Sequence, residues 1–191
     1  MGETVSLLTI QLLAGIAIGT LASVVTLILL YSGLPFFGPV NDLTNAVIGL
    51  MIALLAWQFF AALPKSLPSV AGLLLCWAGA VLIIWNSVLV AFGRMDWKVG
   101  GMYTGIGYGL VGAWLLLTLL FSSLAREFSP ALWWSGVAIG IALVFGVVTG
   151  LLLAGKLSIK IQPLVWVLYA VTALGWIGFP IWCWMLSRTL R

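Results

Sequence analysis

Six apolar runs, each long enough to cross a membrane, make up most of this 191-residue chain. A helix that crosses roughly 30 Å of hydrocarbon needs about 20 apolar residues, because each residue adds about 1.5 Å. We predict spans at 6–31, 43–63, 69–92, 99–124, 131–154 and 164–186. In lipid, the backbone amides of these spans must be satisfied within each helix. The sequence therefore predicts an all-α, polytopic integral membrane protein, with residues 1–191 forming one compact bundle of six transmembrane helices.

The amino-acid composition predicts the same environment independently. Only 6% of the residues are charged, whereas a soluble domain carries roughly 25%. So few charges cannot cover a surface in water, and we expect membrane lipids around the bundle. The net charge of +4 comes from short loops and the C-terminus, where basic residues affect topology. We expect no nucleic-acid partner.

The basic residues do not decide the orientation. They divide evenly between the face that holds both termini (Lys65, Arg126, Arg188 and Arg191) and the opposite face (Arg94, Lys98, Lys156 and Lys160). The positive-inside rule therefore gives a tie, which also permits dual topology or an orientation set by a partner. We expect a bacterial inner-membrane protein with cytoplasmic termini.

The segments between the spans contain turn-forming residues. Asn41 and Asp42 follow Pro39 and are good N-cap residues, so we expect them to start the second helix. The loop 155–163 alternates polar and apolar residues, which predicts an extended segment at the membrane surface. Pro180 inside the sixth span should kink that helix.

The stretch GIGYGLVG, residues 105–112, matches the G-x-G-x-x-G pattern of dinucleotide-binding turns. Such a turn needs a preceding strand and exposed amides at a helix N-terminus. This stretch lies inside a charge-free run, where the helix itself uses those amides. We therefore interpret its glycines as helix-packing residues.

Small residues recur every three or four positions in several spans, a pattern that lets helix backbones approach closely. These helix-packing candidates are Gly15, Gly19 and Ser23, then Gly101, Gly105, Gly109 and Gly112, and finally Ala138, Ala142, Gly146, Gly150 and Ala154. They predict close contacts either between helices of one chain or with other transmembrane helices, in a homo- or hetero-oligomer. Spans one and five have the longest stripes and are the candidates for docking another subunit.

Polar side chains are rare within the spans, so each is a candidate for a role. Gln11 and Gln58 should lie at one depth on antiparallel neighbours and could hydrogen-bond as an interhelical pair. Near the opposite membrane face we predict a polar recess that opens toward the loops holding Asp42, Arg94, Asp96 and Lys98. Its candidate lining residues are Asn86, Thr104, Tyr108, Tyr169, Trp176 and Pro180. The alternative is that these groups only join helices.

Tryptophan is abundant, with eleven copies. Most of them, including Trp182, fall near predicted span ends, as the aromatic belt of membrane proteins predicts. Trp77, Trp85, Trp114 and Trp176 should sit deeper, where they could pack or form the wall of an apolar pocket.

The chain offers little for catalysis. It has no histidine, which removes the usual general base and the commonest metal ligand. Cys76 and Cys183 lie in separate apolar runs, and no carboxylate falls in mid-membrane. We therefore expect no catalytic residues, no metal and no cofactor.

These observations favour a non-enzymatic protein that acts through helix packing, as an accessory or structural subunit of a larger assembly. A lipid-modifying enzyme is a further alternative. The size and span number are similar to those of the substrate-binding component of energy-coupling-factor vitamin importers, and Gly15, Gly19 and Ser23 resemble the stripe on the first helix of that family. The resemblance implies a carrier or substrate-binding component for a small apolar solute or vitamin.

Overall fold

Six long apolar helices form the protein, as predicted. The structure is a computed structural model, and it describes residues 7–121, 128–153, 155, 158–159 and 161–190. The helices are α1 (Leu7–Tyr31), α2 (Phe37–Ala62), α3 (Leu67–Ala91), α4 (Trp97–Phe121), α5 (Pro130–Leu153) and α6 (Gln162–Thr189). Each is long and apolar enough to cross a membrane. The expected extended segment at 155–163 lies partly outside the described residues.

Helix α2 begins earlier than predicted, at Phe37 instead of residue 43. Asn41 and Asp42 therefore lie inside the helix, and the N-cap prediction for them is wrong. Pro39 suggested a break, but it occupies the first turn of α2. The amides of that turn have no intrahelical partner, so a proline there costs no hydrogen bond. The early start brings Asp42 from an expected loop onto a helix wall.

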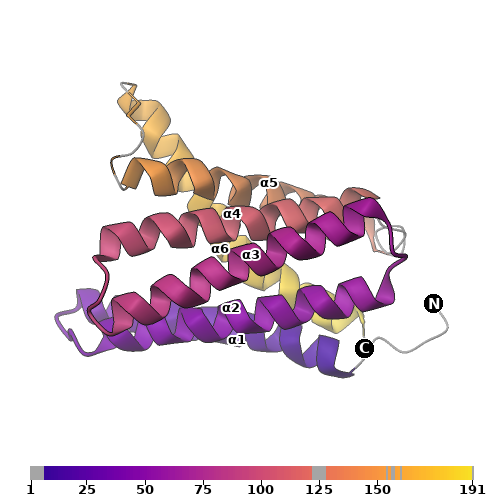
Figure 1. Cartoon of the computed structure of the whole chain (residues 1–191), viewed down its shortest axis with the longest axis horizontal. Helices are drawn as coiled ribbons and strands as arrows, with labels where there is room; N and C mark the ends of the chain where they lie inside the picture. The colour runs from indigo at the N-terminus through magenta and orange to yellow at the C-terminus, as the bar shows by residue number, and fades with distance from the viewer. Residues whose placement is uncertain (1–6, 122–127, 154, 156–157, 160, 191) are drawn as a thin grey trace.

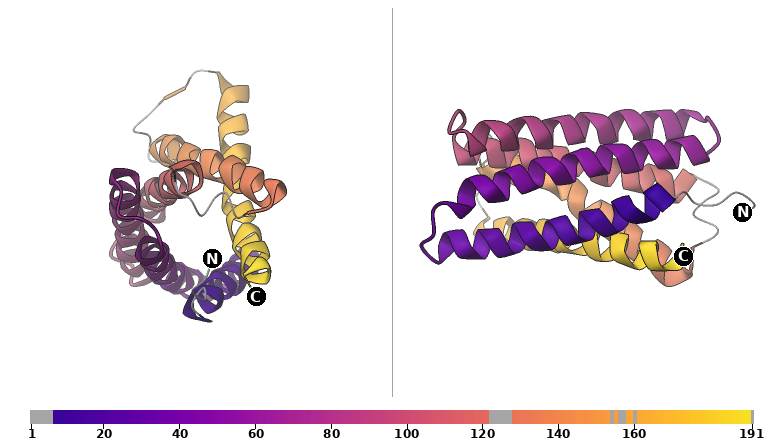
Figure 2. Two further views of the ribbon diagram at one scale, coloured as in Figure 1. Left: turned by 90° about the vertical axis from the view of Figure 1, so that its right-hand side faces the viewer. Right: turned by 90° about the horizontal axis from the view of Figure 1, so that it is seen from below.

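The helices form a closed ring in chain order. Each helix packs against the next one along the chain, and α6 packs against α1 to complete the ring. Figure 2 (left), which looks along the bundle, shows this arrangement, and Figure 1 shows the start of α1 and the end of α6 at one end of the bundle. The helix ends that precede and follow the connections α1–α2, α3–α4 and α5–α6 thus lie at the other end of the bundle, opposite the termini.

Glycine backbones bring α4 and α5 into close contact. A methyl group built on Gly105 would lie 2.6 Å from the carbonyl oxygen of Gly146 and 3.1 Å from Cα of Gly150. One built on Gly112 would lie 2.7 Å from the carbonyl oxygen of Gly140. Real side chains do not approach backbone atoms this closely, so this contact requires glycine on both helices.

The opposite face of α4 makes a similar contact with α3. A methyl group on Gly107 would lie 2.8 Å from the carbonyl oxygen of Gly79. The GIGYGLVG stretch therefore supplies glycines to two neighbouring helices, α3 and α5. The whole stretch is helical, which leaves no exposed turn for a dinucleotide.

Helix α6 packs along only part of its length. All its buried residues lie between Gly175 and Ser187, and Figure 1 shows its N-terminal half leaning away from the bundle. The helix continues through Pro180. The C-terminal half, called the inner half below, packs against the bundle through Phe179 and Trp182, which are 2% and 1% exposed. Because its outer half diverges, the ring is wider at the end opposite the termini.

The tryptophans differ widely in how far the bundle buries them. Trp114 is 3% exposed, whereas Trp77 and Trp85 are 41% and 64% exposed, so a position away from the span ends does not by itself bury a tryptophan in the bundle. Trp182, expected near a span end, is 1% exposed and packs in the core. Helix α6 extends to Thr189, which places Trp182 two turns from its end.

Candidate functional site

A recess of about 820 Å³ occupies the wider end of the ring. Residues from all six helices line it, and the larger part of its wall is apolar. Its lining comprises Leu27, Leu30, Tyr31, Gly38, Pro39, Asn41, Asp42, Asn86, Val90, Trp97, Gly100, Gly101, Thr104, Gly105, Tyr108, Leu143, Gly146, Thr149, Gly150, Leu153, Tyr169, Thr172 and Trp176. A volume of this size matches the usual range for pockets that hold a small molecule.

The recess reaches from the helix ends to about the middle of the bundle. Trp97 starts α4 at the mouth, and Tyr108 lies on the same helix about 16 Å further in, at 1.5 Å per residue. Tyr31 and Trp97 at the mouth are exposed, whereas Tyr108 is 5% exposed. The recess therefore extends from exposed residues at the helix ends to a buried residue in the packed core.

Five of the six residues predicted for a polar recess line this one: Asn86, Thr104, Tyr108, Tyr169 and Trp176. Pro180 does not. It lies one turn beyond Trp176 on α6 and is buried in the inner, packed half of that helix. The proline is thus below the floor of the recess rather than in its wall.

Polar pairs join neighbouring helices around the recess. The Thr104 hydroxyl on α4 donates to Oδ1 of Asn86 on α3 at 2.9 Å, and the Asn86 amide donates to the Leu82 carbonyl. On α5 and α6, the hydroxyl oxygens of Thr149 and Thr172 are 3.4 Å apart. In an apolar surrounding such bonds are worth roughly 0.6–2 kcal/mol each. The polar groups therefore do both things considered from the sequence: they join helices and they line a cavity.

A further polar link crosses the recess floor. The indole N–H of Trp176 on α6 donates to the hydroxyl of Tyr108 on α4. These two helices both pack against α5 but are not adjacent in the ring, so the bond joins two separate parts of the wall. The floor thus consists of two aromatic side chains whose polar ends satisfy each other.

Asp42 contributes a carboxylate to the wall near the mouth. It is half-buried, and it accepts a hydrogen bond from the side chain of Asn41. The Ser23 hydroxyl on α1 in turn donates to Oδ1 of Asn41 at 2.7 Å. This chain from α1 to α2 orients the carboxylate. Sequence reasoning placed Asp42 in a loop beside the recess, and it missed Asn41, Tyr31, Trp97, Thr149 and Thr172 as lining residues.

The small-residue stripes lie against helices of the same chain. On α1, Gly15 and Gly19 face Met51 and Ile48 of α2, and Ser23 bonds to Asn41. On α4, Gly101 faces Leu153, and Gly109 faces Val147, both on α5.

The α5 stripe divides between two directions. Gly146 and Gly150 contact α4, while Ala142 contacts Gly175 of α6. Ala138 is exposed, and Ala154 lies outside the described residues. The proposed Gln11–Gln58 pair stays a prediction, with Gln11 exposed on α1 and Gln58 half-buried on α2.

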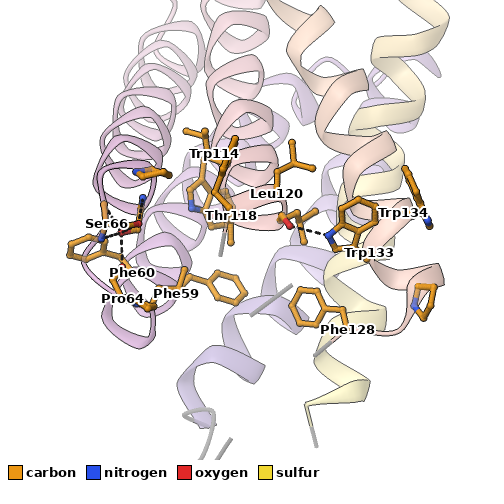
Figure 3. A pocket seen from close by; sticks show the side chains of 17 residues that line it. Phe59, Phe60, Pro64, Ser66, Trp114, Thr118, Leu120, Phe128, Trp133 and Trp134 are labelled. Atoms are coloured by element: carbon orange, nitrogen blue, oxygen red, sulfur yellow. Dashed lines mark hydrogen bonds between the residues drawn. The ribbon is translucent and has the colours of Figure 1, made fainter. Parts of the chain in front are cut away.

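A second pocket, of about 740 Å³, lies at the end of the bundle near the termini. Figure 3 shows aromatic side chains around it, among them Phe59, Trp114, Phe128 and Trp133. The indole N–H of Trp133 donates to the Leu119 carbonyl at 2.9 Å. Phe121 and Phe128, at the ends of the two described segments that precede and follow residues 122–127, both line it.

The described residues contain no cluster of three or more His, Cys, Asp or Glu side chains that could hold a metal ion. Cys76 and Cys183 are free thiols buried on different helices. The chemical groups of the recess are therefore hydroxyls, amides, aromatic rings and one carboxylate in the described lining. Such groups suit recognition of a solute.

Comparison with known protein families, curated proteins and solved structures found no match to this chain. The class of this protein is therefore inferred from its own sequence and structure. The six apolar helices and the scarcity of charge identify an integral membrane protein with a helix-bundle fold.

Proposed function

We propose that this protein binds a small amphiphilic solute within the membrane, as a substrate-binding component or a carrier. The observation that supports this proposal is the recess of about 820 Å³, to which all six helices contribute. Ligand sites are typically concave and mostly apolar, with a few placed polar groups. The polar groups here are Asn86, Thr104 and Tyr108, together with Asp42 near the mouth.

The glycines of the wall support the same proposal. Gly101, Gly105, Gly146 and Gly150 all line the recess. Their missing side chains let α4 and α5 pack closely below the mouth while the space beside them stays open. The bacterial inner membrane as the location and cytoplasmic termini as the orientation remain predictions.

An accessory role in a larger assembly was the leading interpretation of the sequence, and it remains a prediction. It rests on the missing catalytic groups and on the small-residue stripes, for which docking of another subunit is one of two alternatives. Most of these stripe residues, including Gly15, Gly19, Gly105 and Gly146, now have neighbours within the chain. Internal packing, one of the two alternatives that the sequence left open, therefore accounts for most of the stripe residues.

A Gly38→Leu substitution should fill part of the recess and displace the bound solute. Gly38 lines the recess, and a methyl group built there meets only Leu30, at 3.6 Å, an ordinary van der Waals distance. A leucine therefore fits without straining the fold and fills volume. Wild-type protein, released from its membrane in mild detergent, should retain a small amphiphile close to one per chain, measured by mass spectrometry of the extracted solutes. We expect at least tenfold less in Gly38→Leu.

The matched control is Ala61→Leu, which adds a leucine to an exposed position near the other end of the same helix. This variant should retain the wild-type amount of solute. Equal retention by Gly38→Leu and wild type, or no retained solute in wild type, would count against a binding function for the recess.

A further inference from the structure

Asp42 gives the recess a negative charge that the described lining does not balance. It is the single carboxylate of that lining, and no Lys or Arg belongs to it. Among the described residues, no basic side chain lies within ion-pair distance of Asp42, whose recorded partner is the Asn41 amide. Half-buried carboxylates in a membrane span are costly and usually mark a functional site. A ligand that supplies a positive charge would remove this cost.

Aromatic rings surround the same space at two depths. Tyr31 and Trp97 stand at the mouth, Tyr108 and Trp176 form the floor, and Tyr169 also lines the wall. The faces of such rings attract cations, most strongly Trp, within about 6 Å of the ring centre. Trp97 already does so within the chain, because the Lys98 ammonium lies 5.8 Å from its ring centroid.

Lys98 does not neutralise the recess. It is exposed, it is absent from the lining, and its ammonium group lies over Trp97. Solvent and salt screen an exposed charge of this kind far more than they screen a partly buried one. Among the described residues, Asp42 is therefore the charged group that lines the recess.

We infer that the recess selects an organic cation, a molecule with an ammonium group beside Asp42 and an apolar body between the aromatic side chains. This inference rests on the proposed binding function and adds the charge class of the solute. An anionic solute would meet the carboxylate as a like charge. A neutral solute would leave the carboxylate without a counter-ion in a partly desolvated site. A quaternary or protonated amine satisfies both the carboxylate and the rings.

The test compares three probes that share a benzyl group: benzyltrimethylammonium, uncharged N,N-dimethyl-2-phenylacetamide and anionic phenylacetate. Binding is measured by isothermal titration calorimetry on the full chain in nanodiscs of zwitterionic phosphatidylcholine. We expect the cation to bind at least tenfold more tightly than the amide, and phenylacetate to bind least. Asp42→Asn should reduce the preference for the cation over the amide to less than twofold. Asparagine keeps the acceptor for Asn41, so the thermal unfolding midpoint should stay unchanged.

Asp96→Asn is the matched control, since it removes one negative charge at the same end of the bundle from an exposed residue outside the lining. It should keep the wild-type preference. Equal binding of cation and amide by wild type, no binding of the cation, or an equal loss in Asp96→Asn and Asp42→Asn would each overturn the inference. If the amide binds as well as the cation and Gly38→Leu blocks both, the cation inference fails while the binding function stands.

Discussion

Replacement of Gly105 by leucine will force α4 and α5 apart and destabilise the bundle by about 3 kcal/mol or more. The first carbon of the new side chain would lie 2.6 Å from the Gly146 carbonyl oxygen and 3.1 Å from the Gly150 Cα. Both are backbone atoms, so no rotamer change can relieve the clash. In lipid, helix association depends mainly on close packing and interhelical hydrogen bonds, and this substitution removes close packing along a seam.

The measurement is the free energy of unfolding in mixed micelles, together with the yield of folded protein. Ala138→Leu is the matched control. Ala138 belongs to the stripe on α5, which also repeats every four residues, but it is exposed. It should unfold like wild type. A Gly105→Leu protein as stable as wild type would show that the two helices do not meet at these glycines.

Truncation of Trp182 to alanine should cost about 3 kcal/mol of stability, as expected for a large aromatic side chain removed from a core. Trp182 is 1% exposed, and its indole N–H donates to the Leu132 carbonyl at 2.9 Å. Its ring also lies edge-on to Phe128, with centroids 6.4 Å apart. The variant therefore loses both packing and the hydrogen bond that hold the inner half of α6 against α5.

Trp166→Ala provides the comparison on the same helix. Trp166 is 72% exposed on the half of α6 that leans away from the bundle. Its removal should change the unfolding free energy by less than about 0.5 kcal/mol. Similar losses in both variants would mean that the two halves of α6 are equally packed, contrary to the structure.

The sequence predicted the spans well because charge and apolar length directly reflect the membrane environment. Five of the six residues predicted for the recess line it, since antiparallel helices bring residues such as Asn86, Thr104 and Tyr169 to similar depths. The predicted start of α2 is wrong, because Asn41 and Asp42 after Pro39 match an N-cap pattern although a proline is also tolerated within the first turn of a helix. As a result, Asp42 was expected in a loop beside the recess, whereas it lies in the recess wall.

The stripes show a different limit of sequence reasoning. Spacing every four residues identifies a close-packing face on α5, but it does not say which helix lies opposite. Gly146 contacts α4, whereas Ala142, one turn earlier, contacts α6. The pairing Gly112–Gly140 was missed because Gly140 lies off the Ala138–Ala154 repeat. Which helices pack together depends on how the ring closes. The spacing of small residues within one helix carries no information about that.

Cysteine labelling at one depth on two sides of the wall tests whether a recess, open at one end of the bundle, extends among the six helices. Thr104 lines the recess. Phe145 lies at a matched depth, next to Gly146, which contacts Gly105, and it is 38% exposed on the outside of α5. The native Cys76 and Cys183 are both buried and should give little background.

A water-soluble thiol reagent, methanethiosulfonate ethyltrimethylammonium, is applied to Thr104→Cys and Phe145→Cys proteins in lipid nanodiscs. The structure predicts that Thr104→Cys reacts at least tenfold faster, because the recess admits the reagent from its open end while Phe145→Cys faces lipid. Equal labelling rates at the two positions would contradict the existence of an accessible recess inside the bundle.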